Sequence, residues 1–180
     1  MVMMLFGFGR SKIEALRPLL YRIAYAWCHD AALAEDLTQE SLSKAWLSRA
    51  QLREEKALKG WLITILNRCW IDHLRARHTC DDIEDWSETL ETGQDGPEAA
   101  CGRKQIIDCV RVAVARLPLG QRQVLTLVDL EECTYLEVAE ILEIPVGTVM
   151  SRLSRARAML KGFFNQSMAQ AGHPRLRRVK

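Results

Sequence analysis

The stretch TYLEVAEILEIPVGTVMSRLSRARAMLK, from Thr134 to Lys161, carries the clearest local pattern in the chain. Thr134 and Glu137 have the spacing of a capping box, in which each side chain satisfies a backbone N–H at the start of a helix. Pro145 ends that helix and can stand near the start of the next one, because proline lacks the N–H that a helix interior needs. The stretch predicts a short helix, a tight turn and a longer second helix.

The second helix, from about Gly147 to Leu160, separates apolar from polar side chains. Val149, Leu153 and Ala156 fall on one face at helical intervals, and the face with serine and arginine is expected to be exposed. This is the layout of a helix-turn-helix, whose second helix enters a DNA major groove ~12 Å wide. The alternative is a solvated helix face whose arginines bind nothing.

The distribution of charge favours DNA binding. The 180 residues carry 25 Lys+Arg and 23 Asp+Glu, but the net charge of +2 is a cancellation of +4 in residues 1–78, −8 in residues 79–100 and +6 in residues 101–180. From Pro145 to Lys180 there are 8 basic residues and no acidic one. Two positive blocks around a negative one predict a polyanion-binding protein with a separate acidic element.

Helical patterns cover most of the remaining chain. Asp30 can cap one helix, and Pro18 is expected to kink another or to lie near its start. A long helix is predicted over about 57–78, followed after a gap by helices over roughly 98–116 and 119–129, with a break at Leu117-Pro118.

The domain organisation follows from these patterns. Residues 79–100 show no sustained hydrophobic periodicity and include eight acidic residues, which predicts an acidic flexible linker. The fold class is therefore all-α, with two small helical domains (residues 1–78 and 101–165) joined by that linker, and a basic tail over residues 166–180. The C-terminal domain contains the helix-turn-helix.

Composition excludes several classes of protein. A hydrophobic fraction of 48% excludes wholesale disorder, and no charge-free stretch is long and apolar enough to cross a membrane. Six cysteines without a C-x-x-C motif, and no secretory signal, predict a reduced cytoplasmic chain. Cys28-His29, and Cys69 or Cys80 with His73 and His78, lack the tight spacing of a structural zinc site, so no metal and no cofactor is expected. The sequence shows neither a nucleophile–base spacing nor a phosphate-binding loop, so an enzyme is not expected.

Two sets of motifs resemble the extracytoplasmic-function (ECF) sigma factors, group 4 of the sigma-70 family of bacterial RNA polymerase. The region 2-like set is Ala34-Glu-Asp-Leu-Thr-Gln-Glu40, Ala45-Trp46, Trp61-Leu62, Asn67-Arg68 and Ile71-Asp72. The region 4-like set is Leu117-Pro118, Arg122, Tyr135-Leu-Glu-Val-Ala139, Ile144-Pro-Val-Gly-Thr-Val149 and Ser151-Arg-Leu-Ser-Arg-Ala-Arg157. Together they span roughly residues 12–163 in the family order.

The resemblance implies a surface for core RNA polymerase. Asp36, Gln39 and Glu40 match the motif that family members present to the clamp helices of the largest subunit, and the flap of the second-largest subunit is a further implied contact. Asp36 and Glu40 are four residues apart, so their carboxylates share a helix face; the alternative is a solvated acidic face. An anti-sigma factor is also an implied partner.

The resemblance implies two DNA contacts. The −10 element is assigned to Arg53, Glu54, Glu55, Lys56, Ala57, Trp61, Asn67, Arg68, Arg75 and Arg77, where an amide can hold a flipped base and arginines can hold phosphates. For Trp61, packing in the core is favoured over stacking on a base. The −35 element is assigned to Thr148, Ser151, Arg152, Arg155 and Arg157. Arg152 and Arg155 are expected to contact bases directly, and Arg157 is expected at a base or a phosphate. The acidic linker is either a soluble tether or a segment running through the polymerase cleft.

The sequence departs from the family at several positions. Met150 stands where a basic residue is common, and Leu52 and Leu58 stand where phenylalanines are common around the −10 loop. Glu143 stands where glycine is frequent in the turn, and a left-handed backbone there costs glutamate ~1 kcal/mol relative to glycine.

The leading hypothesis is a sigma factor that binds core polymerase and directs promoter-specific initiation, reading −35 duplex and opening the −10 element. One alternative is a stand-alone regulator that uses only the helix-turn-helix and binds palindromic DNA without polymerase. Another is an adaptor that binds only protein, which the acid-free run after Pro145 disfavours.

Overall fold

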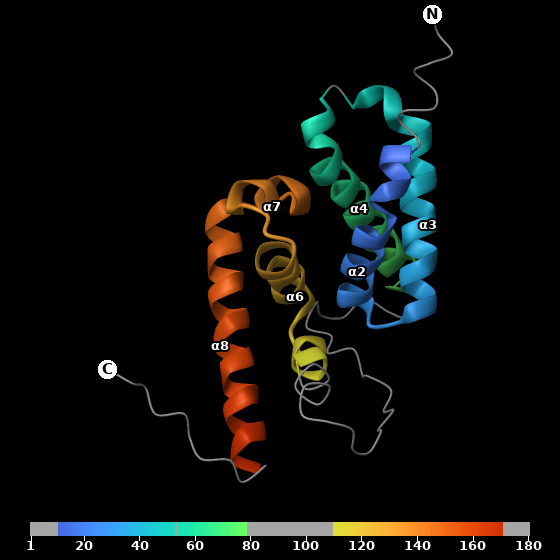
Figure 1. Cartoon of the computed structure of the whole chain (residues 1–180). Helices are drawn as coiled ribbons and strands as arrows, with labels where there is room; N and C mark the ends of the chain where they lie inside the picture. The colour runs from blue at the N-terminus through green and yellow to red at the C-terminus, as the bar shows by residue number, and fades with distance from the viewer. Residues whose placement is uncertain (1–10, 53, 79–109, 171–180) are drawn as a thin grey trace, which may run out of the picture.

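The computed structural model describes residues 11–52, 54–78 and 110–170, and the regular structure in these ranges is helical. Arg53, the predicted acidic linker 79–100 and the tail beyond residue 170 lie outside the described residues. Figure 1 shows α2, α3 and α4 as one group of helices and α6, α7 and α8 as a second.

The first group consists of α2 (Arg17–Cys28), α3 (Ala31–Ser48) and α4 (Leu58–His78). Pro18 lies in the first turn of α2, where its missing N–H costs nothing, so it begins this helix rather than kinking it. Asp30 caps α3 as predicted, since its carboxylate accepts the N–H groups of Ala32 and Leu33 at 2.8 and 3.0 Å.

Two 3-10 turns connect α3 to α4, at Arg49–Gln51 (η1) and Glu55–Ala57 (η2). Residues 51–56, which are mostly polar and charged and are therefore predicted from the sequence as a loop, lie within this connection. The long helix predicted over about 57–78 is confirmed as α4.

The second group consists of α6 (Leu119–Leu125), η3 (Thr126–Leu130), α7 (Tyr135–Leu142) and α8 (Val146–Gln170). Residues 110–115 are also helical, and the predicted break at Leu117-Pro118 is confirmed. The helix predicted over 119–129 is α-helical only as far as Leu125. It continues as η3, a wider π-type turn in which the N–H of Glu131 donates to the carbonyl of Thr126 at 3.1 Å.

The helix-turn-helix forms through the local signals that predicted it. Thr134 and Glu137 form both halves of the capping box at the start of α7. Glu143, in the turn, is left-handed with φ 55° and ψ 44°, the conformation in which a glycine would be less strained.

The two groups share one continuous hydrophobic core. In the first it is built around Leu20, Trp27, Leu37, Leu66 and Trp70, and in the second around Leu117, Leu127, Val138, Val149 and Leu153. The groups meet where α4 packs against α7 and where α2 packs against α6 and η3. This contact fixes how the candidate sites on the two groups of helices lie relative to each other.

Among the described residues, no helix combines the length and the apolar character that crossing a bilayer requires.

Candidate nucleic-acid and polymerase interfaces

The predicted reading face of α8 is opposite its buried stripe. Val149, Leu153 and Ala156 are each at most 2% exposed and hold the helix against the rest of its domain. Ser151 and Arg155 are consequently exposed. An exposed arginine on a helix anchored along its opposite side can enter a groove without disturbing the domain.

Arg152 departs from the prediction that it is fully exposed, because it is half-buried. Its guanidinium lies over Gly120 at the start of α6, so closely that a Cβ at position 120 would stand 2.9 Å from the Cζ atom of Arg152. The absence of a side chain at Gly120 therefore lets Arg152 fold back along its own domain.

Arg157 is exposed but paired with Asp129 of η3. Its Nε donates to the carboxylate of Asp129 at 3.1 Å, and this hydrogen bond raises the pKa of Arg157. The pair links α8 to η3, and Asp129 competes with any phosphate for the same guanidinium.

The three residues predicted to bind polymerase lie together on α3. Asp36, Gln39 and Glu40 are all exposed, whereas the intervening Leu37 and Thr38 are buried. The face is charged and hydrogen-bonded internally: Glu40 pairs with Lys44 at 2.8 Å, and the Gln39 amide donates to Glu35 at 2.9 Å.

The predicted −10 loop surrounds a shallow hollow. Gln51, Leu52, Glu54, Ala57 and Trp61 line a space of about 300 Å³. Trp61 is half-buried, packed against the core on one side and facing this hollow on the other. Its volume is at the lower end of the range of ligand pockets, about 300–1,000 Å³, and the hollow is open to solvent.

Of that loop, residues 54–57 are all exposed. On α4, Arg68, Arg75 and Arg77 are exposed as predicted.

Asn67, which the family resemblance assigns to the −10 element, does not face solvent in this structure. Asn67 is 2% exposed, and its Nδ2 donates to the carbonyl of Ile141 in α7 at 3.2 Å. Its Oδ1 accepts from Nε2 of Gln123 in α6 at 3.0 Å. The second domain therefore covers this predicted −10 residue.

Comparison with protein families accounts for both groups of helices. Residues 13–79 match the family model described as Sigma-70 region 2, and residues 107–160 match the one described as Sigma-70, region 4. The chain is 33% identical to the RNA polymerase sigma-H factor of Pseudomonas aeruginosa over 138 residues, 72% of each chain. It is 32% identical to the ECF RNA polymerase sigma factor EcfG of Rhodopseudomonas palustris over 153 residues, covering 84% of this chain and 82% of the relative. The chain belongs to the ECF sigma factors of the sigma-70 family.

A solved structure agrees with this assignment. The sigma factor RpoE of Bartonella quintana, crystallised with the anti-sigma factor NepR, superposes with a TM-score of 0.67 at 26% identity, covering 86% of this chain and 95% of that one. The two-domain, all-helical fold predicted for this sigma factor is confirmed.

Sequence reasoning missed the residues that join the two domains of this sigma factor. Arg122 is 2% exposed and donates hydrogen bonds to the carbonyls of Trp27, Ala115 and Leu117 at 2.6, 2.9 and 3.0 Å. Glu131 is 8% exposed and faces Arg22. In the sequence, Arg122 is marked only by its place in the region 4-like motif. No periodicity marks a charged residue that is buried by a different domain.

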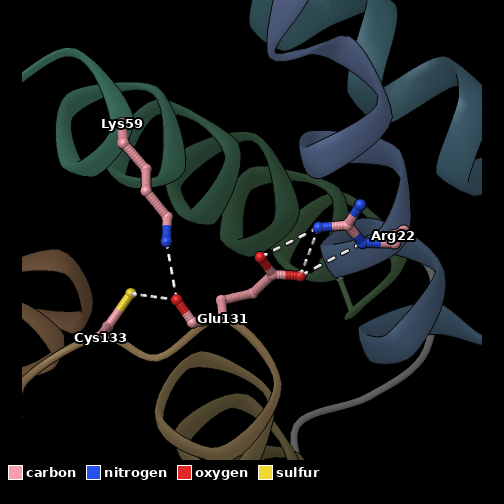
Figure 2. A network of polar contacts seen from close by, with 4 residues as sticks. All are labelled: Arg22, Lys59, Glu131 and Cys133. Carbon is pink, nitrogen blue, oxygen red and sulfur yellow. Dashed lines mark hydrogen bonds and ion pairs between the residues drawn. The ribbon is translucent and has the colours of Figure 1, made fainter.

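Among the described residues, Cys133 lies at the contact between the two domains, where its thiol donates to the backbone carbonyl of Glu131 at 3.9 Å (Figure 2). Cys28, Cys69 and Cys133 are free, and burial raises the pKa of each thiol, which keeps them protonated near neutral pH. In the part of the chain that the structure describes, no three side chains of His, Cys, Asp or Glu gather as a metal site.

Proposed function

We propose that this sigma factor binds core RNA polymerase through the acidic face of α3, reads the −35 duplex with α8, and holds unpaired −10 bases with its first domain. The observation that carries the proposal is the exposed Ser151 and Arg155 face of α8, opposite the buried stripe of Val149, Leu153 and Ala156. Membership of the sigma factor family implies the process in which this face would act, which is the recognition of a promoter at transcription initiation.

For the −35 element, α8 has the properties of a major-groove helix. Arg155 is exposed and can pair with the O6 and N7 atoms of guanine through two hydrogen bonds. Ser151 lies one turn and Thr148 about two turns nearer the start of α8, and we expect both to contact a base edge or a phosphate. Arg152 reaches DNA only after leaving Gly120, and Arg157 only in competition with Asp129.

For the −10 element, the hollow beside Trp61 supports capture of a flipped base. One side of the indole faces the hollow, and Glu54 and Ala57 form its rim. An aromatic side chain in such a place can stack on a base of any sequence. Arg68, Arg75 and Arg77 on α4 are exposed and would hold the phosphates of that strand.

For polymerase, Asp36 and Glu40 present two carboxylates from one rigid helix. A basic surface on the largest subunit is their expected counterpart, with the flap of the second-largest subunit as a contact of the second domain. The relative crystallised with NepR supports an anti-sigma factor as a further partner of this chain. These partners imply a cytoplasmic site of action.

Run-off transcription with core RNA polymerase tests the proposal. We expect the full chain to stimulate transcription from a subset of a promoter library, and the double variant Asp36→Asn/Glu40→Gln to lose this stimulation at limiting concentration. The matched control is Glu140→Gln, which removes one exposed carboxylate from α7. Absence of stimulation from every promoter would refute the proposal.

A further inference from the structure

The start of α8 is uncharged and bears a large exposed apolar side chain. From Val146 to Ser151 the helix carries no Asp, Glu, Lys or Arg. Met150 is 53% exposed, whereas Val149 beside it is fully buried against the rest of the domain. In a helix-turn-helix, the N-terminal residues of the second helix are the ones that reach base edges. Met150 therefore stands at the part of α8 proposed to enter the DNA groove, and the proposed function gives it no role.

The charged side chains that flank this part of α8 are held by their own domain. Arg152 folds over Gly120 at the start of α6. Arg157 lies seven positions beyond Met150, about two turns farther along the same side of the helix, and pairs with Asp129 at 3.1 Å. The tip of α8 thus offers DNA a methionine rather than a guanidinium at this position.

The polar side chain next to Met150 has a restricted choice of partners. The hydroxyl of Ser151 donates to the backbone carbonyl of Thr148 at 3.1 Å. A serine whose only hydroxyl hydrogen is used in this way can still accept a hydrogen bond from a base, but it cannot donate one. Acceptance selects an amino group, as on adenine or cytosine, so Ser151 leaves the recognition of a thymine to another side chain.

Gly147 leaves bare the side of Met150 that faces the helix start. Long side chains in a helix lean toward its N-terminus, over the residue three or four positions earlier, which for Met150 includes Gly147. Among the described residues, a Cβ at position 147 would meet no atom within 4 Å outside its chain neighbours and its own helix backbone. Packing within the protein therefore does not require glycine here, although glycine is less favourable in a helix than alanine. The missing side chain gives an approaching base room beside the methionine.

We propose that Met150 is a specificity-determining residue, and that its side chain packs on the C5 methyl group of a thymine in the −35 element. The inference deepens the proposed −35 role of α8 and depends on it. The thymine methyl is the apolar group that base pairs expose in the major groove, so it matches an exposed apolar side chain on a reading helix. Methionine is unbranched and polarisable, which suits it to contact with a small group on an aromatic ring.

The position of Met150 along α8 predicts where that thymine lies. Met150 and Arg155 are five positions apart, which is about 7.5 Å along the helix. Base pairs follow one another every ~3.4 Å along the duplex. We therefore expect the thymine within about two base pairs of the pair that Arg155 contacts.

Replacement of thymine by deoxyuridine tests the contact, because deoxyuridine pairs like thymine and lacks only the C5 methyl group. Holoenzyme assembled from core RNA polymerase and the full chain is bound to a promoter duplex enriched from a genomic library. Each thymine of the −35 element is then replaced in turn. We expect one replacement to weaken binding about fourfold, the factor that corresponds to one methyl group lost from a buried apolar contact.

Four variants assign this effect to a side chain. Met150→Ala should bind the two duplexes equally well, and Met150→Leu should keep the preference for the methylated duplex. Met150→Lys should lose the preference and steepen the salt dependence of binding by about 1 in log K against log salt, since a lysine at this place meets a phosphate. Thr148→Ser removes the methyl group of the neighbouring threonine and should keep the preference.

Val112→Ala is the matched control. Val112 is 52% exposed, like Met150, but belongs to the helical segment that precedes Leu117. That segment leads to Arg116, whose guanidinium lies 5.8 Å from the centre of the Phe163 ring in the later part of α8. Phe163 is about 20 Å farther along α8 than Met150, so the control should bind both duplexes as the unmodified chain does.

Equal responses to deoxyuridine in the unmodified chain and in Met150→Ala would overturn the proposal, as would enriched promoters without a thymine in the −35 element. Loss of the preference in Thr148→Ser, with Met150→Ala unaffected, would assign the methyl contact to Thr148 instead. A holoenzyme that enriches no promoter at all would overturn the proposed function itself. Promoter binding without a methyl preference at any thymine would leave that function standing and overturn only the role of Met150.

Discussion

Three arginines on α8 have the same charge and different surroundings. Arg155 is exposed, Arg152 folds over Gly120, and Arg157 pairs with Asp129. A guanidinium that is already free loses no protein contact when it enters a groove. Arg155 is therefore the residue from which we expect the largest direct contribution to −35 recognition.

Substitution of Arg155 by alanine should weaken binding of the holoenzyme to a −35 duplex by about 1–3 kcal/mol and relax selectivity at one base pair. Arg157→Ala should cost less, because Asp129 already competes for that side chain. Competition binding against duplexes changed one base pair at a time measures both effects. Equal losses at every base pair for Arg155→Ala would assign it to a phosphate instead.

His29 is a second residue whose surroundings decide its behaviour. Burial, with a smaller contribution from the positive charge of Arg122, lowers its pKa from 6.5 to about 4. Between these two values the unfolded chain binds more protons at this site than the folded protein does. The free energy of unfolding should therefore fall as pH drops from about 7 to about 5.

His29→Asn should flatten this pH dependence, and asparagine tolerates the left-handed backbone of position 29, where φ is 55°. Urea unfolding at several pH values checks it, with the variant and the unmodified chain compared at each pH. The same dependence in both proteins between about pH 5 and 7 would contradict the assignment to His29.

At the scale of elements, the capping box determines where α7 begins. The N–H and the hydroxyl of Thr134 donate to Glu137 at 2.7 and 2.8 Å, and these bonds lower the pKa of the Glu137 carboxyl. The N–H of Glu137 donates back to the Thr134 hydroxyl at 3.3 Å. Since α7 packs against both α8 and α4, its first turn supports the helix-turn-helix and the contact between the two domains together.

Thr134→Ala should lower the free energy of unfolding by about 1 kcal/mol, within the range of about 0.5–2 known for N-cap threonine. Chemical denaturation measures the change. Ser43→Ala, at an exposed position inside α3, is the matched control and should change stability by less than about 0.5 kcal/mol. Equal effects of the two substitutions would mean that the cap contributes nothing.

At the scale of the whole molecule, the net charge of +2 conceals a strongly uneven distribution. Eight acidic residues fall within positions 79–100 of the sequence, and from Pro145 to Lys180 there are 8 basic residues and no acidic one. Formation of the promoter complex depends on the charges that meet phosphates, not on the total.

Promoter-complex formation should therefore weaken steeply with salt, with a slope of about −5 in log K against log salt if about six phosphates are contacted. Lys161→Ala, on the exposed side of α8, should reduce the slope by about 1 if that lysine meets a phosphate. A salt titration of holoenzyme binding measures both slopes. A slope near zero would show that the positive blocks do not face DNA.

Local sequence signals are enough to predict most of the helices and the helix-turn-helix, and the motifs are enough to identify the family. Caps such as Asp30 and Thr134, and breaks such as Pro118 and Pro145, act within a few residues, so their effect is readable from the neighbouring letters. The family resemblance marks Glu143 as a departure from a common glycine, and the structure gives this residue the left-handed backbone considered for it.

Which polar side chains face water could not be predicted from the sequence, because it depends on long-range packing. Asn67, Arg122 and Glu131 are polar or charged and carry no local mark of burial, yet each is buried by a segment 56 or more positions away in the chain. Burial at such separation depends on how one finished domain packs against another. That packing places the second domain over part of the surface that the first would offer to DNA.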